Sequence, residues 1–170
     1  DFSSGKPPLQ VKYWENWGQS NVLDGWTDPG DKQLVGDFMG LGHDQVLLIN
    51  STPLGGRIAI GDFSSGKLQI KYWENWGQSN VLNGWTDPGD LQLAGDFMGL
   101  KHDQILFINV NPQGGRVMIA DFSSGKPPLQ VKYWENWGEE KILDGWIDKF
   151  INLAGNFTAL GDDQLFLLTQ

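Results

Sequence analysis

The chain has 170 residues, of which 39% are hydrophobic, so it is long enough for one domain with a packed core. Its formal net charge is −9, which argues against nucleic acid as a partner because two polyanions repel each other. Cysteine is absent from the sequence, which excludes disulfide frameworks, thiolate zinc sites and thiol catalysis. No apolar run approaches the roughly 20 residues that a membrane-spanning helix needs.

A long repeat organises the sequence. The motif "DFSSGK" begins at Asp1, Asp62 and Asp121, which divides the chain into repeats 1–61, 62–120 and 121–170. Self-similarity on this scale decides the architecture before any local pattern does. The 23 glycines and 8 prolines favour strands and tight turns over helices.

Each repeat predicts four strands, which in the first copy cover residues 9–17, 34–38, 45–50 and 57–63. The third of these, "QVLLIN", is a continuous apolar run, typical of a strand that is buried on both faces. Turn segments rich in Gly and Pro, such as "TDPGD" and "TPLGG", separate the strands. Four short antiparallel strands per repeat are typical of one blade of a β-propeller. We therefore predict an all-β fold, a β-propeller of four-stranded blades with one blade per repeat.

The third repeat lacks its last strand, and three blades are too few to close a ring, since propellers have about 4–8 blades. Three interpretations stay open. The chain is a segment of a larger propeller, or two copies pair as a homodimer into a six-bladed ring, or a partner completes an open array.

All nine tryptophans lie in a repeated stretch that first reads "KYWENWGQSNVLDGWTDPGD", from Lys12. Trp14 and its equivalents Trp73 and Trp134 stand in mid-strand, where we expect them to pack between blades. Trp17 and Trp26 stand near the ends of a long connection, where propellers place binding surfaces. An indole face stacks well on the C–H face of a sugar ring, and neighbouring amides and carboxylates then bind the hydroxyls.

The candidate ligand-binding residues are therefore the later indoles of each stretch and the polar groups beside them: Glu15, Asn16, Trp17, Asn21, Trp26, Glu74, Asn75, Trp76, Asn80, Trp85, Trp137 and Trp146. In the third repeat Glu139, Glu140 and Lys141 replace the polar residues of the first, so a third site should be altered.

Catalysis is not expected. Glycoside hydrolysis needs two carboxylates about 5–10 Å apart. Glu15 and Asp24 form such a candidate pair in the first repeat, but Asn83 replaces the aspartate in the second. His43 and His102 occupy equivalent turns on separate blades, and we expect both to be solvent-exposed turn residues rather than a metal pair.

The segment "GDFMGLGHDQVLLIN" resembles the FG-GAP or VCBS-type repeat, an Asp-Phe-x-Gly-x-Gly turn followed by an Asp and an apolar strand. The family forms β-propellers, which include integrin α heads and lectins of the Psathyrella velutina and Photorhabdus type. The resemblance implies sugar pockets between neighbouring blades. The expected function is thus that of a non-enzymatic lectin, whose repeated sites raise avidity for glycans or glycoproteins. The alternative is an integrin-like adhesion propeller that binds a protein partner.

Many such repeats bind calcium through oxygen side chains in the turn. Here Asp37 and Asp44 match the ends of that loop, but Met39 and Leu41 stand where oxygen ligands would be expected. The equivalent positions are Asp96, Met98, Leu100 and Asp103 in the second repeat and Asn156, Thr158, Leu160 and Asp163 in the third. We therefore expect no cofactor, and we expect Asp37 to cap its turn by binding backbone N–H groups. The expected lectin function implies a secreted or extracellular protein.

Overall fold

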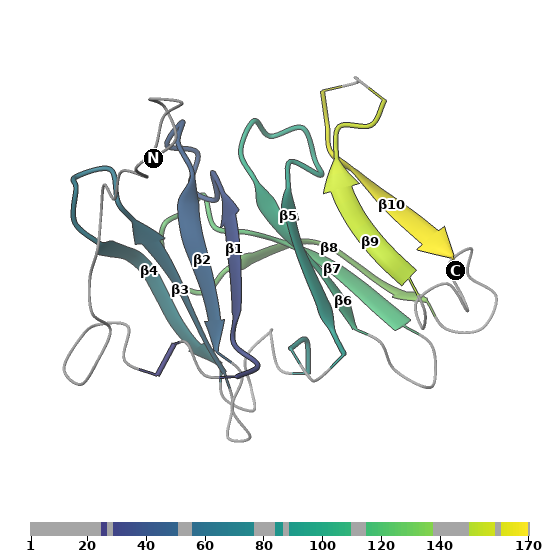
Figure 1. Ribbon diagram of the computed structural model, residues 1–170, viewed down its shortest axis with the longest axis horizontal. Helices are drawn as coiled ribbons and strands as arrows, with labels where there is room; N and C mark the ends of the chain where they lie inside the picture. The colour runs from purple at the N-terminus through teal and green to yellow at the C-terminus, as the bar shows by residue number, and fades with distance from the viewer. Residues whose placement is uncertain are drawn as a thin grey trace, which may run out of the picture.

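The computed structural model describes residues 25–26, 29–50, 56–76, 84–86, 89–109, 115–137, 150–158 and 161–169. These ranges form strands and turns, which build three antiparallel sheets that stand side by side (Figure 1). The first sheet contains β1 (Lys32–Gly36), β2 (Gln45–Asn50), β3 (Gly56–Asp62) and β4 (Gln69–Trp76). The second sheet contains β5 (Leu91–Gly95), β6 (Gln104–Asn109), β7 (Gly115–Asp121) and β8 (Gln130–Trp137). The third sheet pairs β9 (Phe150–Gly155) with β10 (Gln164–Thr169).

The prediction of an all-β chain with four-stranded antiparallel sheets is confirmed, but the predicted grouping of strands into repeats 1–61, 62–120 and 121–170 is wrong. The first sheet spans residues 32–76 and the second spans 91–137, so each crosses a repeat boundary. The reason is the length of the connections. The short turn after β3 joins it to β4 as an antiparallel hairpin, whereas a much longer connection separates β4 from β5. The "KYWENW" strand therefore ends a sheet rather than beginning one.

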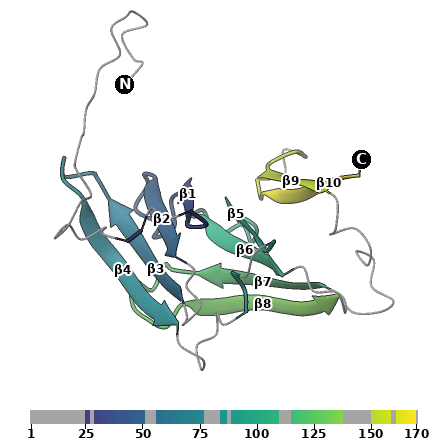
Figure 2. The ribbon, with the colours of Figure 1, turned by 60° about the horizontal axis from the view of Figure 1, so that its bottom comes forward.

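The sheets are closest to one another at their first strands. β1 contacts β5, and β5 contacts β9, whereas the backbones of β4 and β8 do not approach any strand of another sheet this closely. Within each complete sheet the strands follow chain order, so β4 and β8 are the edge strands farthest from these contacts (Figure 2).

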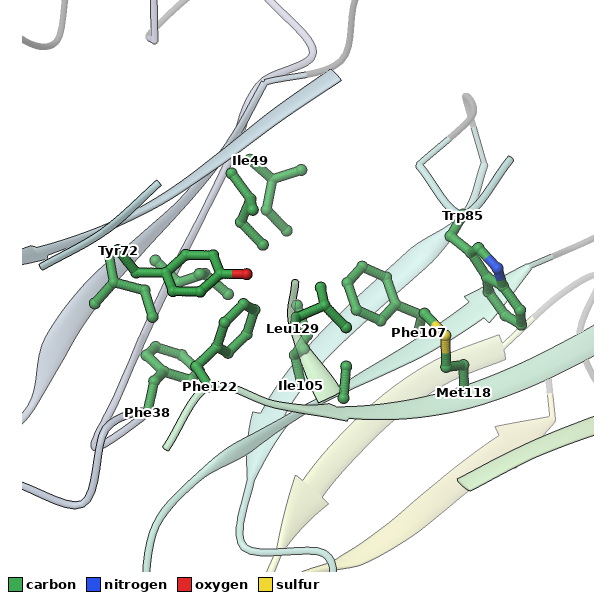
Figure 3. Packing of buried hydrophobic residues seen from close by; sticks show 13 residues of the cluster. Phe38, Ile49, Tyr72, Trp85, Ile105, Phe107, Met118, Phe122 and Leu129 are labelled. Atoms are coloured by element: carbon green, nitrogen blue, oxygen red, sulfur yellow. The ribbon is translucent and has the colours of Figure 1, made fainter. Parts of the chain in front are cut away.

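A large apolar cluster fills the space between the first and second sheets. Phe38 and Tyr72 from the first sheet meet Phe122 from the second edge to face, with ring centroids 6.4 Å and 5.1 Å from its ring (Figure 3). Strand residues of both sheets complete the cluster: Leu47, Ile49, Ile58, Ile60, Ile105, Phe107, Met118 and Ala120. The other face of the second sheet buries Leu106, Ile108 and Val117, with Leu165 of the third sheet packed against them.

A pair of aspartates, one from each sheet, joins neighbouring sheets. The N–H of Asp37 donates to Oδ2 of Asp103 at 2.7 Å, and the N–H of Asp103 donates to the carbonyl of Asp37 at 2.9 Å. The second and third sheets repeat this aspartate pair with Asp96 and Asp163, at 2.7 and 2.8 Å. One geometry therefore relates each sheet to the next.

Candidate functional site

Two tryptophans that we expected to stack on a ligand are part of the core. Trp26 is 1% exposed and Trp85 is 3% exposed. The guanidinium of Arg57 lies 4.7 Å from the ring centroid of Trp26, and that of Arg116 lies 4.8 Å from the ring of Trp85. Since an arginine covers each indole in place of a ligand, the expectation that these two rings form a sugar-binding surface is wrong.

The polar groups around Trp26 explain its position. Arg57 donates to the carbonyl of Gly25 at 3.0 Å, and Asn50 donates to the same carbonyl at 3.0 Å and to Asp31 at 2.7 Å. Arg116, Asn109 and Asp90 repeat this network around Gly84. These networks fix the connection before each first strand, so the motif "GW" serves packing rather than recognition.

Glu74, another expected ligand-binding residue, is also buried. Its carboxylate accepts a hydrogen bond from the Tyr72 hydroxyl and another, at 3.1 Å, from the N–H of Leu129 in the second sheet's hairpin. Burial, followed by the bond to Glu74, raises the pKa of Tyr72. Glu74 therefore joins two sheets and is not available to a ligand, whereas its neighbour Asn75 is exposed.

The other candidates have no described side chains. Six of them lie outside the described residues: Glu15, Asn16, Trp17, Asn21, Asn80 and Trp146. Trp76 and Trp137 are the last residues of β4 and β8, and only their backbone is described.

The exposed indoles belong to the other tryptophan position, which the sequence led us to expect in the core. Trp73 is 39% exposed and Trp134 is 51% exposed. Trp134 pairs in register with Met118, so it shares the face that packs on the first sheet, and yet half of its surface is accessible. It stands on β8, the edge strand of the second sheet. Polar groups follow each indole along the strand, with Asn75 and Asn136 both exposed.

The turn after β1 uses its first aspartate as a cap, as we expected. One carboxylate oxygen of Asp37 accepts the N–H of Leu41 and the other accepts that of Gly42, each at 2.8 Å. Asp96 does the same for Leu100 and Lys101. Across the described ranges, no three His, Asp or Glu side chains gather closely enough to hold a metal ion.

The two histidines do more than face solvent. His43 lies 3.1 Å from Asp62, and His102 lies 3.0 Å from Asp121, which links two turns at one end of each sheet. The backbone N–H of Ser64 is the main reason that the pKa of Asp62 falls to about 2, against the opposing effect of burial. Burial alone would raise the pKa of Asp121, but bonds from Ser123 and His102 lower it. The expectation of free turn histidines is therefore wrong for His102, which is mostly buried.

Searches against protein-family models and against curated proteins find no match. Among solved structures, the chain is similar to the rhamnogalacturonan lyase YesW, with a TM-score of 0.51 and 13% sequence identity. The match covers 81% of this chain and 28% of the lyase chain. At this identity the likeness concerns the fold alone. Within the described ranges there is no helix with the length and apolar character that crossing a bilayer requires.

Proposed function

We propose that the chain is a non-enzymatic carbohydrate-binding protein whose sheets are blades of a β-propeller of the FG-GAP type. The observation that carries the proposal is the half-exposed indole of Trp134, at the edge of the space between two packed sheets. A sugar bound there would stack on the indole and place its hydroxyls near the amide of Asn136. Trp73 and Asn75 are the equivalent pair of the first sheet.

One feature supports this site over the one expected from the sequence. The indole is repeated at the same register position of both complete sheets, opposite Ala59 in one and Met118 in the other. Repetition suits a lectin, since several weak sites on one scaffold raise avidity. A solved structure similar to this chain is named as a rhamnogalacturonan lyase, which agrees with a carbohydrate ligand but identifies neither the sugar nor the site.

The test begins with a glycan array probed with the labelled chain, followed by calorimetric titration of the best glycan. We expect Trp134→Ala to weaken binding at its own site roughly tenfold or more, equivalent to about 1.4 kcal/mol, and to leave the Trp73 site unchanged. The matched control is Tyr133→Ala. Tyr133 is a similarly exposed aromatic residue on the opposite face of the same strand, and its loss should leave glycan affinity unchanged.

Two outcomes would contradict the proposal. If a folded sample binds no glycan, the carbohydrate function fails, and the protein-binding alternative becomes the better hypothesis. If a glycan binds but Trp134→Ala and Tyr133→Ala have equal affinity, the lectin function stands and the site is wrong.

A further inference from the structure

Asp44 occupies, in the first sheet, the position that Asp103 and Asp163 hold in the second and third. The carboxylates of Asp103 and Asp163 each bind the backbone N–H of an aspartate in the preceding sheet. Asp44 is exposed, while Asp103 and Asp163 are both partly buried. The first sheet therefore presents one half of an aspartate pair at the surface.

The face of the first sheet beside Asp44 is apolar and accessible. A row of paired residues crosses it from β1 to β4: Val35, Val46, Gly61 and Ile70. Val35 at the start of this row is 62% exposed. Trp73 stands on the same face, opposite Ala59. The apolar cluster on this face contains only residues of the first sheet and its own connections, among those described: Trp26, Val46, Leu48, Ala59, Leu68 and Ile70.

The corresponding row of the second sheet shows what covers such a face. There Ala94, Ile105 and Ala120 take the register positions of Val35, Val46 and Gly61, and all three pack in the cluster between the first and second sheets. Val131, the equivalent of Ile70 at the end of the row, is 38% exposed. A neighbouring sheet of the same repeat is thus the surface that fits this row of residues.

The third sheet presents the other half of the contact. Asn156 stands where Asp37 and Asp96 stand in the earlier sheets, with an N–H and a carbonyl in the same turn position. Phe157 is the equivalent of Phe38, which is buried against Phe122 of the next sheet, and yet Phe157 is 53% exposed. Among the described residues, both kinds of interface residue are therefore exposed on the same chain: Asp44 and Val35 in the first sheet, and Asn156 and Phe157 in the third.

We propose that the exposed face of the first sheet docks on the third sheet of a second copy of this chain, and that Asp44 of one copy pairs with Asn156 of the other in the geometry of the two aspartate pairs. The contact is head to tail, so it joins different surfaces of the two copies. It goes beyond the proposed glycan binding and does not depend on it. Because each copy carries a net charge of −9, added salt should strengthen the association.

Sedimentation velocity over a range of protein concentrations, at low and high salt, tests the association. We expect assemblies larger than one chain. Val35→Glu should raise their dissociation constant at least tenfold, because docking would desolvate the new carboxylate. Lys126→Glu is the control, because it adds negative charge at an exposed hairpin of the second sheet. A folded wild type that stays monomeric at every concentration, or equal weakening by both variants, would overturn the proposal.

A mixing experiment tests the two residues directly. The chain has no cysteine, so Asp44→Cys and Asn156→Cys each create one reactive thiol. With a short bis-maleimide cross-linker, the mixture of the two variants should give a covalent dimer, and neither variant alone should give it efficiently. Equal cross-linking of each variant with itself would show a different interface, and so would absence of a product in the mixture while sedimentation shows association.

Discussion

Asp37 and Asp103 exchange two hydrogen bonds across the first and second sheets, with N to O distances of 2.7 and 2.9 Å. The residue before Asp37 has to be small for this to happen. A Cβ placed on Gly36 would lie 2.4 Å from Oδ2 of Asp103 and 3.2 Å from its Cβ. All three repeats have a glycine at this position. For Gly36 and Gly95, the close approach of an aspartate from the next sheet explains it.

We expect Gly36→Ala to lower the free energy of unfolding by about 1–3 kcal/mol, since Asp103 cannot move away without breaking its bond to Asp37. Urea denaturation followed by tryptophan fluorescence measures the change. Gly155→Ala is the control, because the nearest described atoms to its Cβ would be those of the Phe157 ring, at an ordinary contact distance of 3.5 Å, and its effect should stay within about 0.5 kcal/mol. Equal loss in the two variants would mean that the aspartate pair does not constrain this position.

The hydroxyl of Tyr72 should matter for stability far more than that of Tyr133. Both donate to a glutamate two residues later on the same strand. Glu74 is buried between two sheets, whereas Glu135 is partly exposed and water can replace the lost donor. We expect Tyr72→Phe to cost about 1–3 kcal/mol and Tyr133→Phe less than about 0.5 kcal/mol. Thermal unfolding of the two variants measures both losses of stability, and a larger loss for Tyr133→Phe would contradict the assigned role of Glu74.

The strands themselves could be predicted from hydrophobic pattern and turn residues, and residues 45–50 form β2 as expected. Their grouping into sheets was missed because a repeat defines a period but not its phase. The length of the connections held the missing signal, since β3 and β4 are joined by a short turn. The exposure of the tryptophans could not be predicted in this way. Trp26 is covered by Arg57, which belongs to a strand formed far along the chain.

Acid should destabilise the fold through Asp62. Its pKa is about 2 in the folded chain against an ordinary value of 3.8, so the unfolded chain binds a proton first as the pH falls. The stabilisation from ionised Asp62 is complete above about pH 4 and is lost as the pH falls toward about 2. We expect the urea midpoint of the wild type to drop over this window and that of Asp62→Asn to drop less.

A graded variant tests the cause of this acid dependence. Ser64→Ala removes the hydroxyl that lies 2.9 Å from Asp62 but keeps the backbone N–H at 2.8 Å, so its acid dependence should fall between those of the wild type and Asp62→Asn. Asp103 acts in the opposite direction, since burial raises its pKa and the group favours the folded chain at lower pH. If Asp62→Asn lost stability with acid as steeply as the wild type, another group would carry the effect.

Lys101 and Gly42 offer a reciprocal test of backbone strain. They occupy equivalent turns, and both have positive φ, 63° for Lys101 and 77° for Gly42. The N–H of each donates at 2.8 Å to the capping aspartate of its turn, so the two turns differ mainly in side chain. A lysine is strained in this left-handed conformation and a glycine is not, but glycine costs more entropy on folding.

We expect Lys101→Gly to raise the free energy of unfolding by about 0.5–1 kcal/mol and Gly42→Lys to lower it by a similar amount. In calorimetry this corresponds to a shift of about 1–4 °C in Tm, upward for the first variant and downward for the second. A downward shift for both would show that the exposed Lys101 side chain contributes more than the strain of its backbone removes.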